Sequence, residues 1–262
     1  MGVDELDAVG VAKSFVEARR AGRTIATYPG TAPGGLDEAY RIQDAAIALA
    51  DETIAGWKVG KIAPALAGID RLAGPIFAAQ VVTETSEPVA MPVFAGGFAA
   101  AEAEFLLRLG ATPTPGKTRW SMDEARGLVD AVHVGIEIAS SPYPGINADG
   151  PAVTVSDFGN NNGLVVGAAI AEWHDVDLDT WPVALLINGS EAGAATTATM
   201  LDGPFGAVRF LLEHAARRGL PLTAGDWIST GAVTGVHPVV PGDRVEARFG
   251  KSHIIHCTIR AR

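Results

Sequence analysis

Sulfur and imidazole ligands are scarce in this chain of 262 residues. Its single cysteine, Cys257, excludes an internal disulfide framework, and within the alternating segment 254–259 it is expected to pack in a strand rather than act as a nucleophile. The six histidines do not form a convincing ligand set. His253 and His256, for example, are three residues apart in a presumed strand and therefore point to opposite faces. We read the histidines as structural.

Positive charge is also in short supply. The chain has 20 lysines and arginines against 30 acids, a formal net charge of -10, which argues against a general affinity for nucleic acid or an anionic membrane. No apolar run is long enough to span a bilayer, and Asp4, Glu5 and Asp7 precede any apolar run, so no secretory signal is evident. No glycine motif for nucleotide phosphates follows a predicted strand. We expect a cytoplasmic protein with neither a nucleic-acid nor a membrane partner.

The hydrophobic content of 48% is enough for a substantial core, in one large domain or in one domain with an appendage. Helices are predicted over residues 6–20, where acids come early and arginines late, and over residues 37–50, with Asp37 as the N-cap. A loop at 28–35 separates them. A third helix is predicted from Pro204 to a stop at Gly219.

From Gly56 onward, short β-like runs separated by glycine and proline predict a β-rich core. The predicted strands are residues 57–60, 81–85, 105–109, 132–138, 164–166, 183–187, 227–230 and 244–249. Gly-Asp turns precede the last two runs, at Gly225-Asp226 and Gly242-Asp243.

Three glutamates in apolar surroundings are the most informative feature. Glu102 and Glu104 are two residues apart, so a strand would place both on one face, and Glu137 is the only acid in the apolar segment 131–139. Buried carboxylates are costly unless something neutralises them. Converging carboxylates would suit magnesium, manganese or calcium better than zinc. The alternative is that Glu102 and Glu104 lie on a solvated face.

Several further motifs carry a resemblance to a known family. In chain order they are Ala39-Tyr40-Arg41-Ile42-Gln43, Gly56-Trp57-Lys58-Val59-Gly60, Glu102-Ala103-Glu104, Glu137-Ile138, Asp157, Gly203-Pro204, residues 219–231 and Pro241-Gly242-Asp243. With this order and spacing, the chain resembles the fumarylacetoacetate hydrolase superfamily, in its 2-keto-4-pentenoate hydratase and 4-oxalocrotonate decarboxylase branch. The resemblance implies an α+β fold with a mixed β-roll core and flanking helices. We expect a mainly helical portion over residues 1–80, which contributes Lys58, and a β-rich metal-binding core over residues 81–262.

The resemblance also assigns roles to residues. Glu102, Glu104 and Glu137 match the metal-binding carboxylates of the family, which implies Mg²⁺ or Mn²⁺ as the anchor for a 2-oxo acid. Lys58 matches the lysine of a Gly-x-Lys-[Val/Ile]-Gly motif, and its apolar neighbours are expected to lower its pKa toward proton transfer. The alternative for Lys58 is a solvated lysine on an edge strand. Gly60 is assigned to close approach of a ligand, with a turn as the alternative.

Other matches are looser. Asp157 persists in a loop where relatives carry Asp-Asn-x-Ser, and it joins Lys58 as a predicted catalytic residue. Asn160 and Thr234 are candidates for binding the substrate, although turn capping is equally open for Thr234. For Asn161 and Asn162, loop geometry takes precedence over ligand contact.

One departure from the family affects the predicted reaction. The segment from Asp70 to Ile76 lacks the acidic Pro-Asp-aromatic-Gly element that typical hydratases carry. The missing acid leaves reaction type less constrained than metal binding.

The function expected from this resemblance is hydration of a 2-hydroxy-2,4-dienoate to a 4-hydroxy-2-oxo acid, as in aromatic catabolism. Three alternatives stay open: decarboxylation of a 4-oxalocrotonate-like acid, C–C hydrolysis of an acylpyruvate, and a non-catalytic partner subunit. Hydrolytic relatives often use an amino-terminal His-Glu pair, and here no histidine precedes His133, which lowers the hydrolase alternative. A homo-oligomer is expected, with possible association with a paralogous pathway enzyme.

Overall fold

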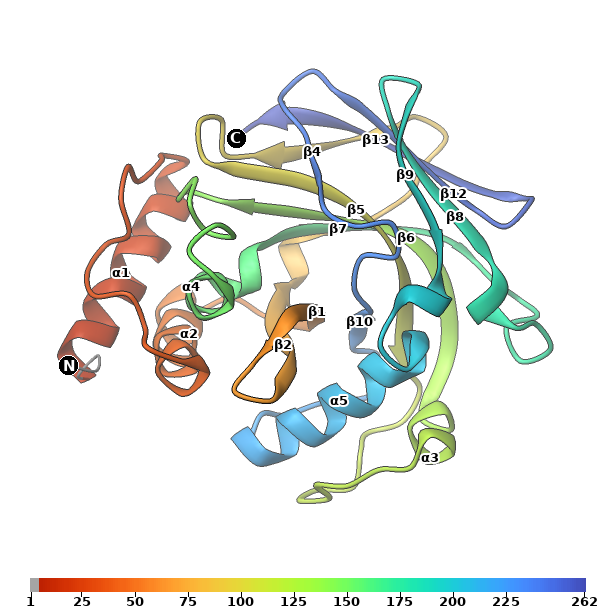
Figure 1. Ribbon diagram of the computed structural model, residues 1–262, viewed down its shortest axis with the longest axis horizontal. Coiled ribbons are helices and arrows are strands. Elements are labelled where there is room, and N and C mark those ends of the chain that lie inside the picture. Colours follow the sequence, from red (N-terminus) through yellow and green to blue (C-terminus); the bar gives the residue numbers. More distant parts are fainter. Residues whose placement is uncertain (1–4) are drawn as a thin grey trace.

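The computed structural model describes residues 5–262, so Asp4, one of the acids named in the sequence analysis, lies outside it. Two sheets and flanking helices make up the fold (Figure 1). This confirms the predicted α+β class with a mixed β-roll core. Within the described residues, no helix is both long and apolar enough to cross a membrane.

Two helices open the described chain and lie side by side in Figure 1: α1 (Glu5–Ala21) and α2 (Leu36–Ala50). They pack through an apolar seam that includes Val11, Phe15 and Ile42. Both helices were predicted, but the predicted N-cap of α2, Asp37, is wrong. Its N-cap is Gly35, without a side-chain hydrogen bond, and Asp37 lies inside the first turn, where a carboxylate favours the helix dipole instead.

The larger sheet has eight strands in the order β2-β1-β10-β5-β6-β7-β3, with β11 paired to β5. Their bounds are β1 (Ile54–Leu66), β2 (Ile69–Phe77), β3 (Val81–Thr83), β5 (Phe98–Leu109), β6 (Val129–Ser141), β7 (Asn161–Ala169), β10 (Trp227–Ser229) and β11 (His237–Pro238). The long antiparallel pair β5 and β6 forms its centre. Strands β1 and β2 belong to the same sheet as β5, so the proposed division at residue 80 stays a prediction.

The second sheet has five strands in the order β4-β13-β12-β8-β9. Their bounds are β4 (Val89–Val93), β8 (Pro182–Ile187), β9 (Ser190–Thr196), β12 (Arg244–Phe249) and β13 (His253–Ala261). Phe105 from the larger sheet meets Phe249 from this one edge to face, with ring centroids 5.2 Å apart, so a shared apolar core joins the sheets. Cys257 is buried in β13, as expected.

Three more helices follow in the chain: α3 (Met122–Arg126), α4 (Pro151–Ser156) and α5 (Gly203–Arg218). Short 3-10 turns occupy Ala78–Gln80, Phe158–Asn160, Leu178–Thr180 and Thr197–Thr199. The predicted stop of α5 is confirmed, because Gly219 adopts φ 68°, a left-handed conformation that glycine enters without strain.

Every predicted strand is present, but the sequence did not predict β2, β4, β9 or the helix α4. Charged Asp70 and Arg71 and the prolines Pro75 and Pro92 hide the strand pattern of β2 and β4. The small residues of β9 carry little strand preference, and α4 has only six residues. Pairing with neighbouring strands therefore forms β2, β4 and β9 despite weak local sequence preferences.

Candidate metal centre

Three carboxylates meet on the two central strands. Glu102 lies opposite Glu137 in the β5–β6 register, and the period of two brings Glu104 to the same face. One oxygen from each lies within 4.8 Å of the others. Glu102 is 4% exposed and the other two are 0% exposed, so the alternative of a solvated face is wrong.

The protein supplies hydrogen-bond donors to only some of the carboxylate oxygens in this cluster. Glu104 Oε2 accepts hydrogen bonds from the Ser229 hydroxyl and, at 2.9 Å, from the Gly231 amide, and Glu137 Oε1 accepts from Asn161 Nδ2 at 2.9 Å. Within residues 5–262, Glu104 Oε1 and Glu137 Oε2 are buried without a hydrogen-bond partner. Buried acceptors normally find partners, because leaving them without one is costly. The all-oxygen donor set and its two unpartnered atoms fit a hard divalent cation.

Lys58 on β1 is the cation of the cluster. Its Nζ lies 3.2 Å from Glu137 Oε1 and donates to Asn160 Oδ1 at 3.2 Å, and the side chain is buried. The alternative of a solvated lysine is therefore wrong. So is the expected fall in its pKa. Burial alone would lower that pKa, but the negative charges of Glu137, Glu102 and Glu104 together raise it above its ordinary value.

The carboxylates respond to the same crowding in the opposite direction. Burial, opposed by Lys58 and reinforced by Glu137, raises the pKa of Glu102 to about 7. Burial and the charges of Glu137 and Glu102 raise the pKa of Glu104 well above its ordinary value. One lysine does not balance three carboxylates in a buried site, so additional positive charge would stabilise their ionised forms.

Asparagines following Asp157 connect to this cluster. Asn160 Oδ1 accepts from Lys58, and its Nδ2 donates to Asn147 Oδ1 at 2.8 Å. Asn161 begins β7 and donates to Glu137, while Asn162 donates to the Pro92 carbonyl. The prediction that Asn161 and Asn162 mainly serve loop geometry is wrong. The left-handed conformations belong to the three residues before them, Phe158, Gly159 and Asn160.

Asp157 lies in a separate group of charges. Its carboxylate oxygens accept from Arg19 Nε at 2.6 Å and Nη2 at 2.9 Å, and Oδ2 also accepts from the Ser141 hydroxyl at 2.6 Å. Asp157 is 0% exposed and Arg19 6% exposed. Both oxygens are thus occupied by protein donors, which favours a structural role over the predicted catalytic one.

One cavity is lined by a carboxylate of the cluster, and a second cavity shares Gly60 with it. The first, of about 630 Å³, is lined by Glu102, Lys58, Asn160 and Gly60, so it brings together four of the eight predicted site residues. Gly60 is well suited to a cavity wall, since a Cβ there would lie 3.2 Å from Leu72 Cδ1. Gly60 also lines the second cavity.

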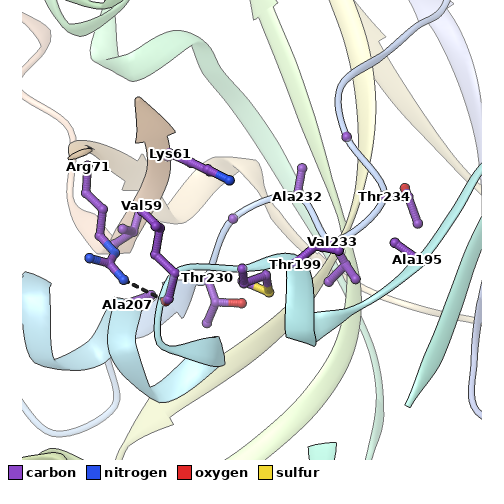
Figure 2. A pocket seen from close by; sticks show the side chains of 15 residues that line it. Val59, Lys61, Arg71, Ala195, Thr199, Ala207, Thr230, Ala232, Val233 and Thr234 are labelled. Carbon is purple, nitrogen blue, oxygen red and sulfur yellow. Dashed lines mark hydrogen bonds between the residues drawn. The ribbon is translucent and has the colours of Figure 1, made fainter. Parts of the chain in front are cut away.

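The second cavity, of about 360 Å³, contains Thr234 (Figure 2). Thr234 Oγ1 lies 3.1 Å from His237 Nε2, so the hydroxyl has a neighbour within the protein. Figure 2 shows Arg71 and Lys61 on the side opposite Thr234. Arg71 lies in the segment that lacks the acid of the family; it is buried and donates to the Leu201 carbonyl at 2.6 Å. Thr234 therefore lies apart from the Lys58 and Asn160 group.

Sequence reasoning missed four parts of the site: Arg19, Asn161, Ser229 and the Gly231 amide. Arg19 resembles an ordinary arginine in the last turn of a helix. Burial of Asp157 would have been the signal, because a buried aspartate requires a cation or several donors, but the sequence analysis did not predict that burial. Ser229 and Gly231 lie in a quoted motif, but only the fold brings them to Glu104.

Comparison with known proteins identifies the family of the chain. The family model for the fumarylacetoacetate (FAA) hydrolase C-terminal region matches residues 74–260. A 2-keto-4-pentenoate hydratase from Burkholderia vietnamiensis is 30% identical over 241 residues, 88% of each chain. A 4-oxalocrotonate decarboxylase from Pseudomonas putida is 32% identical over 121 residues, which span 46% of this chain and 46% of that relative.

Among solved structures, a decarboxylase shares the fold over nearly the full length of both chains. It is the 4-oxalocrotonate decarboxylase from Pseudomonas putida G7, complexed with magnesium and adipate, with a TM-score of 0.79 and 21% identity. The match covers 98% of each chain.

Proposed function

The chain belongs to the fumarylacetoacetate hydrolase family, and from that premise we propose that it is a divalent-metal-dependent hydro-lyase. Its proposed reaction adds water to a 2-hydroxy-2,4-dienoate and yields a 4-hydroxy-2-oxo acid. The observation that carries the proposal is the buried cluster of Glu102, Glu104 and Glu137, in which two carboxylate oxygens have no partner among the described residues. The resemblance to a hydratase over 88% of the chain supports the reaction type.

Glu102, Glu104 and Glu137 would hold Mg²⁺ or Mn²⁺. When bound, the cation would supply a Lewis-acid anchor for the carboxylate and 2-oxo oxygens of the substrate and would offset the negative charge that raises the pKa of Lys58. The fixed backbone of β5 and β6 sets the spacing of these acids before any ligand arrives.

Lys58 is the proposed proton carrier, because its ammonium group lies at the cavity wall and is oriented from two sides by Glu137 and Asn160. In the proposed sequence, the ammonium group of Lys58 donates a proton to C5 of the substrate, and the resulting amine takes the proton of the 2-hydroxyl, which leaves a 2-oxo group and a C3=C4 double bond. Water then adds its oxygen to C4 and a proton to C3. Asn160 is proposed to contact the substrate from the same cavity, and Thr234 from the neighbouring one.

The second candidate is decarboxylation of a 4-oxalocrotonate-like acid. It is favoured by the similarity to the Pseudomonas putida decarboxylase and by the absence of the acidic family element near Arg71. Both reactions require the same stabilised enolate, so the carboxylate cluster serves either one. Acylpyruvate hydrolysis and a non-catalytic partner role follow as weaker candidates.

Incubation of metal-stripped protein with freshly generated 2-hydroxypenta-2,4-dienoate tests the proposal. We expect addition of one water, detected by mass and proton spectra, only after Mg²⁺ or Mn²⁺ is restored. Parallel incubation with 4-oxalocrotonate distinguishes the second candidate by release of carbon dioxide. No metal-dependent product from either substrate would reject both candidates and direct attention to acylpyruvates or to co-purification with a paralogous enzyme.

The proposal also includes a cytoplasmic location, a homo-oligomeric assembly or association with a paralogous pathway enzyme, and no nucleic-acid or membrane partner. Size measurement of the purified protein, alone and with a co-expressed paralogue, tests the assembly.

A further inference from the structure

The turn before β7 has an unusual backbone. Phe158, Gly159 and Asn160 adopt φ values of 57°, 62° and 58° in succession. A bulky residue such as Phe158 rarely enters the left-handed region, and such strain persists only where the surroundings fix it. On one side the turn rests against Gly74, where a Cβ would come within 2.1 Å of the Phe158 carbonyl oxygen. The glycine permits the contact but does not fix the ends of the turn.

Arg19 of α1 fixes both ends. Before the turn, its guanidinium donates to the carboxylate of Asp157 at 2.6 and 2.9 Å. After the turn, Nη1 donates to the Asn161 carbonyl at 3.2 Å and to Asn162 Oδ1 at 3.3 Å. A third group of contacts reaches β6, where Nη2 donates to the Ser140 carbonyl at 3.0 Å. The planar fork of an arginine can hold several acceptors in a fixed geometry, which a lysine cannot.

The held segment leads directly into the metal centre. Asn160, the last residue of the turn, accepts from the ammonium group of Lys58, and Asn161, the next residue, donates to Glu137. Both asparagine side chains therefore orient members of the charged cluster from the segment that Arg19 spans. A shift of this segment would disturb Lys58 and Glu137 together.

Docking of α1 does not depend on Arg19 alone. An apolar seam that includes Val11, Phe15 and Ile42 joins α1 to α2. The adjacent Arg20 donates to the carbonyls of Leu49 and Ala50 at 2.8 and 2.9 Å. The four acceptor residues of Arg19 instead lie in and around the turn and on β6. The neighbouring arginines thus have different tasks.

We propose that Arg19 is a positioning residue of the metal centre, acting through the left-handed turn to orient Asn160 and Asn161 against Lys58 and Glu137. This inference rests on the proposed function for its effect on turnover, but its effect on metal affinity can be measured without any substrate. Helix α1 would thus help to position the residues of the metal centre, although Arg19 is far from the carboxylates in sequence.

The test uses two variants of the full chain, because a single neutral substitution at Arg19 would strand the buried Asp157 charge. Arg19→Lys keeps the charge and removes the fork. The double variant Arg19→Gln with Asp157→Asn removes both charges. Titration calorimetry with Mg²⁺ alone should show affinity weakened by roughly 10- to 100-fold in both, the range typical of groups that orient metal ligands. With substrate and saturating Mg²⁺, kcat should fall more than KM rises.

Arg20→Gln is the matched control, since it removes a neighbouring arginine that donates hydrogen bonds to the carbonyls of Leu49 and Ala50 on α2. It should lower the melting temperature while leaving the Mg²⁺ affinity unchanged. In Arg19→Ala protein, low non-denaturing concentrations of guanidinium should restore part of the Mg²⁺ affinity, whereas sodium chloride of equal ionic strength should not.

Folded Arg19 variants with the Mg²⁺ affinity and kcat of the original protein would overturn the inference while leaving the proposed function intact. Conversely, failure of the original protein to turn over any tested substrate would reject the proposed function. A loss of Mg²⁺ affinity confined to the Arg19 variants would still support the positioning role in that case.

Discussion

Two groups of buried charge are connected through the segment from Asp157 to Asn161, but their hydrogen bonds are satisfied in opposite ways. The Arg19–Asp157 pair has a protein partner for both carboxylate oxygens. The cluster around Glu104 leaves two buried oxygens without one among the described residues, and has one lysine for three acids. A buried polar group normally has a partner, and one without a partner requires an explanation, such as a bound ion. Completeness of hydrogen bonding therefore distinguishes Asp157 from the glutamates that we propose as metal ligands.

Among the substitutions that test this difference, Glu104→Gln should have the largest effect. We expect Mg²⁺ affinity measured by calorimetry to fall at least about 100-fold, since the change removes a ligand rather than a supporting group. The stability of the metal-free protein should move the other way. The pKa of Glu104 is raised in the folded state, so ionisation opposes folding as pH rises above the ordinary glutamate range, and the amide removes that cost.

Glu191→Gln, an exposed position on β9, is the control for this experiment and should change neither quantity. Unchanged Mg²⁺ binding by the Glu104→Gln protein would contradict the assigned metal centre.

Lys58→Met separates metal holding from proton transfer. We expect kcat to fall by roughly 10²- to 10⁴-fold, the range for loss of a general acid–base group. The affinity for Mg²⁺ should not fall, since the substitution removes a positive charge next to the metal site. Steady-state kinetics and calorimetry on the same preparation measure both. Lys61 lies on the same strand and lines the same cavity, so Lys61→Met is the matched control and should lower kcat less than Lys58→Met does. Equal losses in the two variants would remove the special role of Lys58.

Asp157→Asn tests the complete ion pair. The change leaves Arg19 buried beside a neutral amide, so the free energy of unfolding should fall by about 3–5 kcal/mol, as for other broken buried pairs. Asp130→Asn breaks an exposed pair, in which Arg108 Nε lies 2.9 Å from Asp130 Oδ1, and should cost at most about 1 kcal/mol. Denaturant unfolding of both proteins gives the comparison. Similar costs at the two positions would mean that burial does not determine the contribution of the Asp157 pair.

The same contrast explains what the sequence could predict. The period of two in β5 placed Glu102 and Glu104 on one face, and the apolar run around Glu137 predicted a buried neighbouring strand, so the convergence of the three glutamates was within reach of sequence reasoning. Arg19 was not, because 138 residues separate it from Asp157 and its helix would look the same with a solvated arginine. Lys58 was located but its pKa was predicted in the wrong direction, since its apolar neighbours in sequence matter less than the carboxylates the fold brings to it.

His214 extends the comparison to a titratable group that is buried without charge. On α5 it packs against Tyr40, with ring centroids 4.7 Å apart, and against Phe210 at 5.2 Å. Burial first, and then the charges of Arg218 and Arg217, lowers the pKa of His214 to about 3. The unfolded chain binds this proton near pH 6.5 and the folded chain does not, so stability present above about pH 6.5 is lost as the pH falls toward about 3.

The loss from this one group approaches about 1.4 kcal/mol per pH unit. In His214→Phe protein the free energy of unfolding should lose that contribution to its pH dependence between pH 6 and pH 4, measured by denaturant titration on metal-free protein. His174→Phe, at an exposed position, should keep it. Because an uncharged ring needs no counter-ion, the effect should persist whether or not Mg²⁺ is present, unlike that of Glu104. An equal slope in the original and His214→Phe proteins would show that the folded chain admits the charge at this position.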